Sequence, residues 1–351
     1  MAAAAGVFGE GEEGFSLSEV SQRIVDFIDC DGATHEKLKG LYEKFRGRAL
    51  ALRRSLAKQL QGRIMSLFQD SLKLLKIERN LLSVDELSIA SAYDTHSIPA
   101  RLYRPRAAAN RLIVYFHGGG WIQGSVQMDD ELCRKFAVGV GASVLSVDYR
   151  LAPEYPFPFG LGDAVSAFLW AFKRREDGDF SGEIYLCGES AGGNLAAAAS
   201  LKLWDEFGRR YRPDGQILFY PPLSPNLFSE TFHRFESGYV LTGELLRNFY
   251  YNYLGQEFEC VDKENSYIFP CAELDATKFP RTFFVAAGLD PLCSNGEEFA
   301  SRLREARVPL EYLRFGGALH GFVAYHGAYR EEFNATVGKL RAWIDAGGDF
   351  R

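Results

Sequence analysis

The chain has 351 residues, of which 47% are hydrophobic, so it can bury a large core and is longer than a minimal doubly wound sheet requires. Its formal net charge of −6 offers no general attraction to phosphate-rich partners, and we expect no nucleic-acid binding. Its 6 cysteines form no Cys-x-x-Cys pair or Cys/His cluster, which excludes a disulfide framework and a metal site from our expectations.

The N-terminal quarter carries no motif that indicates chemistry. Residues 1–15 lack a basic and apolar export signal, and we expect them to be disordered. Residues 16–82 show long helical periodicity and predict a helical cap segment. The basic stretch 37–76 has an alternative interpretation, contact with an anionic membrane. Because no apolar run approaches the roughly twenty residues that span a bilayer, we expect a cytoplasmic protein without stable membrane insertion.

Residues 83–351 alternate apolar, strand-like runs with helix-like stretches. This alternation predicts an eight-stranded, mostly parallel sheet covered by helices on both faces, with ligands bound at the carboxyl ends of the strands. The expected helices include 128–140, 162–174, 194–207 and 295–307. The expected strands are 87–93, 99–104, 111–117, 142–148, 183–188, 216–220, 281–287 and 309–315.

Three glycines follow the third expected strand, in the run His117 to Trp121. A bare backbone of this kind lets a substrate approach amide N–H groups, which an acyl-transfer enzyme uses to stabilise a tetrahedral oxyanion. We therefore expect Gly118 and Gly119 to be oxyanion-hole donors, with Ala191 as a third. The alternative of a phosphate-binding loop lacks the Lys-Ser/Thr that would follow in P-loop spacing.

Ser190 lies in the run Gly-Glu-Ser-Ala-Gly-Gly, between the fifth expected strand and a stretch of small residues. Glycines two residues away on each side permit the cramped strand-to-helix turn that exposes a nucleophilic serine. The pentapeptide alone is also compatible with an ordinary glycine-rich turn. The serine interpretation depends on finding a base and an acid later in the chain.

Both partners follow later strands. Asp290 ends the strand 281–287 at its carboxyl edge, and His320 comes in a glycine-flanked loop after the strand 309–315. Because this order matches a nucleophile-acid-base sequence, we expect Asp290 to orient His320 and His320 to act as general base for Ser190. The other histidines after Ser190, and the other aspartates between Ser190 and His320, do not end a strand. They are His233, His326, Asp205, Asp214, Asp262 and Asp275.

These motifs resemble the hormone-sensitive-lipase-like family of α/β-hydrolases, which includes carboxylesterases, arylacetamide deacetylases and gibberellin receptors. The resemblance also includes Asp148 to Glu154, Pro156 to Pro158 and Asp163-Ala164, and it covers about residue 88 to the C-terminus. Glu189 stands where the family commonly has aspartate. The resemblance implies an α/β-hydrolase fold, with a cap formed by the N-terminus and an insertion, here at about 224–269.

The function that we expect is hydrolysis of small to medium acyl esters through an acyl-enzyme, without a cofactor. Candidate substrate-binding residues are Trp121, Tyr250 and Phe322, although cap aromatics also serve simply as packing. Activity should fall below about pH 6 to 7 as His320 gains a proton. Amide or N-acetyl hydrolysis, a small-molecule receptor and an interaction protein working through its N-terminal helices remain alternatives, and a homodimer is a candidate assembly.

Overall fold

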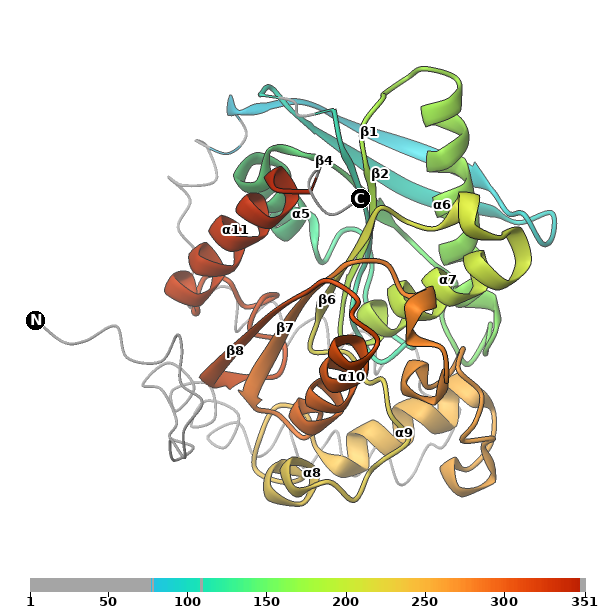
Figure 1. The fold of residues 1–351 in the computed structure, drawn as a ribbon, viewed down its shortest axis with the longest axis vertical. Coiled ribbons are helices and arrows are strands. Elements are labelled where there is room, and N and C mark those ends of the chain that lie inside the picture. The colour runs from blue at the N-terminus through green and yellow to red at the C-terminus, as the bar shows by residue number, and fades with distance from the viewer. Residues whose placement is uncertain (1–76, 78, 108–109, 348–351) are drawn as a thin grey trace, which may run out of the picture.

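A single eight-stranded sheet forms the centre of the computed structural model, which describes residues 77, 79–107 and 110–347 (Figure 1). The strand order is β1-β2-β4-β3-β5-β6-β7-β8. The strands are β1 Leu81–Ala90, β2 Ser97–Pro105, β3 Leu112–Phe116, β4 Ser143–Val147, β5 Ile184–Glu189, β6 Gly215–Phe219, β7 Thr282–Leu289 and β8 Leu310–Leu319. Only the β1–β2 and β2–β4 pairs are antiparallel in this sheet of described residues. The predicted eight-stranded, mostly parallel sheet is confirmed.

The first strand differs from its predicted bounds of 87–93. It begins at Leu81, inside the predicted helical segment 16–82, and it ends at Ala90. The chain turns after Ala90 because the Ser91 hydroxyl accepts hydrogen bonds from the amides of Tyr93 and Asp94. Short polar side chains commonly stabilise turns in this way. The turn at Ser91 therefore ends the strand earlier than the apolar residues beyond it predicted.

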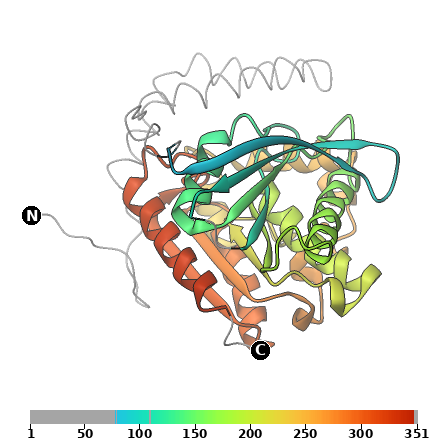
Figure 2. The same ribbon diagram turned by 90° about the horizontal axis from the view of Figure 1, so that it is seen from above.

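Helices cover both faces of the sheet (Figure 2). The α-helices are α5 Asp130–Phe136, α6 Phe159–Glu176, α7 Ala191–Phe207, α8 Glu230–Phe235, α9 Gly243–Leu254, α10 Cys293–Glu305 and α11 Arg330–Asp345. A π-helical turn, η1 Ala137–Gly141, continues α5. The remaining short turns are η2 Arg209–Tyr211, η3 Phe258–Cys260, η4 Pro270–Ala272 and η5 Ala276–Lys278. The last helix, α11, was not among the predicted elements, although Phe333, Leu340 and Ile344 recur on its buried face.

The hydrophobic core has two layers because side chains alternate along each buried strand. In β3, Val114 and Phe116 pack in the layer that also contains residues of α6, α7 and α10. Ile113 and Tyr115 point into the opposite layer, which contains residues of α5 and α11. Strands buried on both faces read as continuous apolar runs, and that pattern made them recognisable in the sequence.

The segment between β6 and β7 contains α8 and α9 and overlaps the predicted cap insertion at about 224–269. The arrowheads of β7 and β8 point toward the end of the molecule where these two helices lie (Figure 1). Ser229 and Thr242 cap them by accepting hydrogen bonds from backbone amides. The rest of the predicted cap, up to residue 76, and the predicted disordered stretch 1–15 lie outside the described residues.

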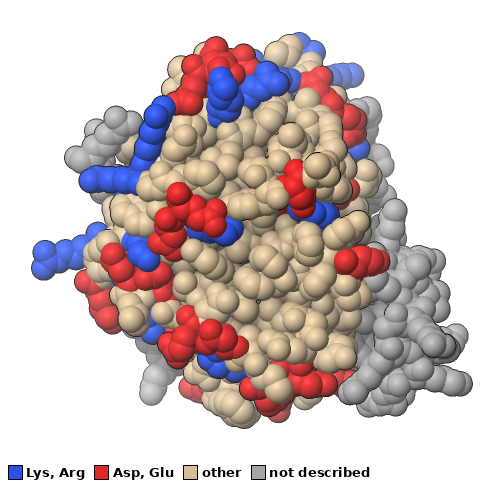
Figure 3. All heavy atoms as spheres, turned by 90° about the vertical axis from the view of Figure 1, so that its right-hand side faces the viewer, with Lys and Arg blue, Asp and Glu red and all other residues tan. Residues whose placement is uncertain are grey.

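The surface shows acidic and basic side chains beside one another on the face seen in Figure 3. Ion pairs are frequent among the described residues, such as Lys173 with Asp177 and Arg174 with Asp179. Within the residues that the structure describes, no helix is both long and apolar enough to pass through a membrane.

Candidate active site

Ser190 occupies a tight turn between β5 and α7, as the sequence predicted. Its φ of 51° is in the left-handed region that residues with a Cβ seldom adopt. The turn is packed so closely that a Cβ on Gly188 would overlap the backbone of Gly192, and a Cβ on Gly192 would overlap the carbonyl oxygens of Phe116 and His117. The glycines around Ser190 are therefore required by this close backbone approach.

The structure brings Asp290, His320 and Ser190 together. Asp290 directly follows β7, and His320 directly follows β8. His320 Nδ1 lies 2.6 Å from Asp290 Oδ2, and His320 Nε2 lies 2.9 Å from Ser190 Oγ. When His320 is neutral, the Asp290 carboxylate can only accept, so Nδ1–H donates to it and Nε2 is free to accept the Ser190 proton. The arrangement has the geometry of a nucleophile, a general base and an orienting acid.

The strand before His320 is longer than predicted. Gly316 to Leu319, expected to lie in a loop, belong to β8, which ends at Leu319. A Cβ on Gly288 would overlap the backbone of Gly316, so β7 and β8 approach closely here. The pairing of β7 with β8 shifts register after Ala287 and resumes with Leu289 opposite Leu319, the residue before His320.

The glycine loop after β3 lies beside the Ser190 turn. Gly118 does not offer a free amide, because its N–H donates to the Glu189 carboxylate. Within the described residues, the N–H groups of Gly119, Gly120 and Ala191 have no acceptor. Gly120 was not among the predicted oxyanion donors, although the run of three glycines already contained it.

A family model described as the alpha/beta hydrolase fold matches residues 113–324 of this chain. The chain belongs to the α/β-hydrolase family. A curated relative, the carboxylic ester hydrolase LipN of Mycobacterium tuberculosis, is 34% identical over 75% of this chain and 72% of its own. The arylesterase of Saccharolobus solfataricus is 35% identical over 70% of this chain and 78% of its own.

Solved structures show the same relationship. The esterase of Pyrobaculum calidifontis superimposes with a TM-score of 0.75 at 28% identity, covering 94% of this chain and 99% of the esterase. The ester hydrolase EH1AB1, from the metagenome of Lake Arreo, has a TM-score of 0.80 at 26% identity and covers 94% of this chain and 99% of its own. The family resemblance inferred from the sequence motifs is confirmed.

The electrostatics of this α/β-hydrolase site favour a histidine that is easily protonated. Burial alone would lower the pKa of His320, but the charge of Asp290 and the hydrogen bond to it outweigh burial and raise the pKa above the usual value. The Glu189 carboxylate acts in the same direction. A base with a raised pKa binds the Ser190 proton more firmly once it has taken it.

The three candidate substrate-binding residues are all buried. Trp121 stacks on Tyr253 with ring centroids 4.4 Å apart, and it also contacts Tyr250. These contacts join the glycine loop to α9, where the Phe249 ring lies against Gly120. Phe322 is fully buried and packs against Tyr220 and Phe315 in the core layer of α5 and α11. Phe322 therefore packs beneath the loop that follows His320, and its contact with substrate stays a prediction.

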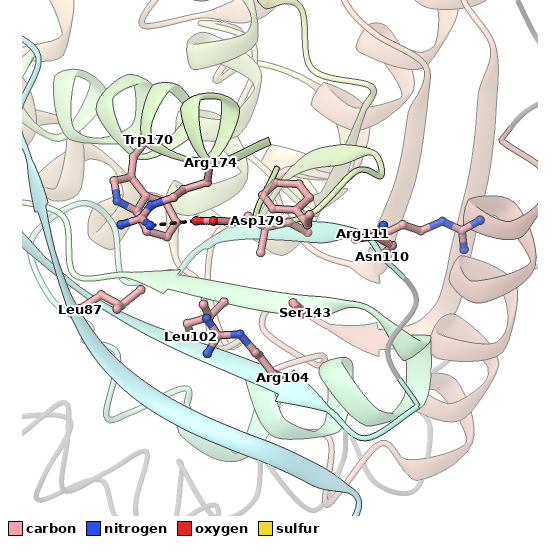
Figure 4. Close-up of a pocket in the computed structure, with 11 residues that line it drawn as sticks. Leu87, Leu102, Arg104, Asn110, Arg111, Ser143, Trp170, Arg174 and Asp179 are labelled. Carbon is pink, nitrogen blue, oxygen red and sulfur yellow. Dashed lines mark hydrogen bonds and ion pairs between the residues drawn. The ribbon is translucent and has the colours of Figure 1, made fainter. Parts of the chain in front are cut away.

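A cavity of about 450 Å³ lies away from this site, at the amino ends of the strands (Figure 4). Its lining includes Leu112 and Ser143, the first residues of β3 and β4. Trp170 and Arg174 of α6 lie across it from Leu87 and Leu102 (Figure 4). Its three arginines are already paired with carboxylates, in the ion pairs Arg104–Asp85, Arg111–Glu183 and Arg174–Asp179. The cavity is thus remote from Ser190, which stands at the carboxyl end of β5.

Proposed function

We propose that this protein hydrolyses carboxylic esters with small to medium acyl groups through an acyl-enzyme on Ser190. The observation that carries the proposal is the hydrogen-bonded chain from Asp290 through His320 to Ser190, beside amide N–H groups without acceptors. Similarity to curated ester hydrolases and to solved esterases supports it. Ser190, His320, Asp290 and the backbone amides together supply the groups that this chemistry requires.

In the first half of the reaction, His320 Nε2 takes the proton of Ser190 as the Ser190 oxygen attacks the ester carbonyl carbon. The N–H groups of Gly119, Gly120 and Ala191 stabilise the resulting oxyanion, and Asp290 stabilises the protonated imidazole. The carbon–oxygen bond to the alcohol then breaks, and the alcohol leaves with the proton from His320. An acyl group remains on Ser190.

In the second half, a water molecule replaces the alcohol. His320 accepts a proton from this water while the water oxygen attacks the acyl carbon, and the same amide groups hold the second oxyanion. Ser190 leaves with the proton from His320, and the carboxylic acid is released. The enzyme returns to its starting protonation state, so the cycle requires only ester and water.

The position of α9 bears on substrate choice. We assign Trp121 and Tyr250 to the roof that limits the size of the acyl or alcohol group, because they join the glycine loop to α9. We assign Phe322 a supporting role. A roof packed directly on the glycine loop favours small groups over long acyl chains.

The test is a series of p-nitrophenyl esters from acetyl to palmitoyl, run beside an arylacetamide. We expect the highest kcat/KM with acetyl to hexanoyl esters and a steep fall toward palmitoyl. Faster turnover of the arylacetamide than of every ester would replace ester hydrolysis by amide hydrolysis. No turnover together with tight binding of a small acid would indicate a receptor, an alternative that the short Ser190–His320 distance disfavours.

The location and assembly of the protein are separate proposals. We propose that the protein is cytoplasmic and forms a homodimer. Fractionation of the source cells tests the location. Size-exclusion chromatography of the full-length protein with light scattering tests the assembly. A mass of about 39.3 kDa in solution, the value for one chain, would contradict the homodimer.

A further inference from the structure

Glu189 and Tyr220 form a buried hydrogen bond directly behind Ser190. Glu189 is the last residue of β5, and Tyr220 is the first residue after β6. The Tyr220 hydroxyl lies 2.8 Å from Glu189 Oε2, and both side chains are buried. Tyr220 adopts a φ of 39°, a conformation that a residue with a large side chain keeps only when its surroundings impose it.

The Tyr220 hydroxyl makes two hydrogen bonds. It donates its proton to Glu189, because an ionised carboxylate can only accept. The backbone N–H of Val323 donates to the Tyr220 hydroxyl oxygen at 3.2 Å. Val323 lies three residues after His320, and the Tyr220 ring meets the His320 ring edge-on at 5.0 Å. Tyr220 therefore connects Glu189 with the loop that carries the imidazole.

Glu189 also holds the glycine loop. The Gly118 N–H donates to its carboxylate, and a Cβ on Gly118 would overlap that carboxylate. One buried side chain, adjacent to the nucleophile in sequence, thus touches the segment that precedes Gly119 and Gly120. Through Tyr220 it reaches the segment that follows His320.

We propose that Glu189 and Tyr220 act as a positioning pair, which fixes the glycine loop and the His320 loop relative to Ser190. This inference rests on the proposed function, because it concerns the same hydrolytic site. Neither residue contacts the reacting atoms in our scheme. Their effect is to hold two separately supplied groups, the oxyanion donors and the base, at the distance that the reaction requires.

The charge of Glu189 gives the pair a second, measurable effect. Burial and the charge of the neighbouring Asp129 together raise the pKa of Glu189 to about 7, although the hydrogen bonds from Tyr220 and Gly118 and the charge of His320 act in the opposite direction. When ionised, Glu189 raises the pKa of His320. The groups that face His320 are Asp290, Ser190, Tyr220 and Glu189. Those that face Glu189 are Asp129, His320, Tyr220, Tyr115, Tyr149 and Tyr325.

The experiment compares E189Q, E189D, Y220F and E189Q/Y220F with wild type and the control Y312F. Tyr312 is a tyrosine of β8 whose hydroxyl has no partner within the described residues. For each variant, kcat and KM for p-nitrophenyl butyrate are measured from pH 5 to 9, and the thermal unfolding midpoint is recorded. We expect Y220F to lose about 10- to 100-fold in kcat with less than about threefold change in KM, because misplacement affects the reaction more than binding.

The double variant and the pH profiles separate positioning from general damage. The kcat of the double variant should lie within about threefold of the kcat of the slower single variant, because both substitutions disrupt the same pair. E189Q should move the acid limb of kcat/KM to lower pH, since the charge that raises the pKa of His320 is gone. E189D retains that charge. Its acid limb of kcat/KM should therefore lie at the same pH as in the wild type, while its kcat should be lower.

The inference is overturned if Y220F matches Y312F in kcat, or if the two single losses multiply in the double variant. An unchanged acid limb in E189Q would overturn the part that concerns charge. These outcomes differ from failure of the proposed function, in which the wild type itself hydrolyses no ester. In that case the rate at which a fluorophosphonate modifies Ser190 replaces kcat as the readout for the same variants.

Discussion

At the carboxyl ends of the strands, the Asp290 and Glu189 carboxylates and the His320 imidazole are buried. At the amino ends, the Arg111 and Arg174 guanidinium groups that line the cavity reach solvent. Arg174 and Asp179, beside the cavity, pair with about half of each side chain exposed. Backbone strain is concentrated at the carboxyl edge as well. Among the described non-glycine residues with positive φ, Ser190, Tyr220 and Trp121 lie at the carboxyl edge, and Arg307, before β8, lies at the amino edge. The carboxyl edge therefore carries most of the strained residues and the buried charges of the site.

This difference distinguishes a functional site from an ordinary protein surface. A buried charge is costly unless hydrogen bonds satisfy it, so it persists where a network has been built around it. An exposed ion pair costs little and contributes little. Substitutions at the carboxyl edge should therefore alter activity and pH dependence strongly, and matched substitutions at the amino edge should alter neither.

The largest expected effect is that of S190A. Removing the nucleophile should lower kcat/KM for p-nitrophenyl butyrate by at least about a thousandfold and up to about 10⁶-fold, with the residual rate coming from binding and the oxyanion donors. Steady-state kinetics measure the loss. The matched control is S143A at the amino end of β4, which should retain activity within about twofold. Equal activity of S190A and S143A would remove the contrast between the edges.

D290N should have the next largest effect. The amide leaves the geometry almost intact but no longer holds the His320 tautomer or stabilises its charged form, and kcat should fall by about 10⁴-fold. D179N provides the comparison, since it neutralises an exposed carboxylate at the amino edge. We expect wild-type kcat for D179N. A loss below about tenfold in D290N would mean that another group orients His320.

The pH dependence of kcat/KM should show an acid limb set by His320. Because the pKa of His320 is raised above its usual value of roughly 6.5, the neutral base is lost as the pH falls through a value above 6.5. A pH series from 4 to 9 at constant ionic strength measures this limb. Constant activity down to about pH 4 would exclude an imidazole base.

His326, in the segment after β8, should govern acid stability rather than activity. Burial, together with the charge of Lys135, lowers the pKa of His326 to about 3. The unfolded chain binds a proton at this residue near its usual pKa of roughly 6.5, so the free energy of unfolding should fall as the pH drops from about 6.5 toward 3. H326Q should flatten that fall, as measured by urea unfolding across this range.

The control for this experiment is H233Q, because His233 is exposed in α8. Its urea unfolding curve should keep the pH dependence of the wild type. If H326Q and wild type lose stability equally on acidification, the imidazole of His326 is already charged in the folded protein, and the assignment of its lowered pKa is wrong.

The smallest effect should come from R174A. Its ion pair with Asp179 is about half exposed, and such pairs contribute roughly 0 to 1 kcal/mol. Urea unfolding should give a change of at most about 1 kcal/mol, and the esterase rate should not change. A large loss of activity in R174A would show that the two sheet edges are coupled, and it would contradict the contrast drawn above.

Much of the fold could be predicted because its physical causes are local. Strands such as β5 and β7 are buried on both faces and read as continuous apolar runs, and glycines mark the turn at Ser190. The end of β1 could not be read in this way, because the Ser91 side chain sets the turn. The amphipathic pattern of α11 is present in the sequence, although this helix was not predicted.

For the site, the sequence indicated which side chains converge, because parallel strands place their carboxyl ends at one edge. It did not indicate the hydrogen-bond partners of the backbone. That the Gly118 amide is bound by Glu189, and that Phe322 turns into the core, depends on tertiary packing around Tyr220. The role of Tyr220 could not be predicted from the neighbouring sequence, because tyrosine is common in and beside strands of any sheet.

The most direct test of the central claim is labelling of the full-length protein with a fluorophosphonate, followed by mass spectrometry of the digested protein. The account predicts one stoichiometric adduct on the peptide that contains Ser190, loss of esterase activity in proportion to labelling, and no adduct in S190A. An adduct on a different residue that accompanies inactivation, or full activity after complete labelling of Ser190, would contradict it.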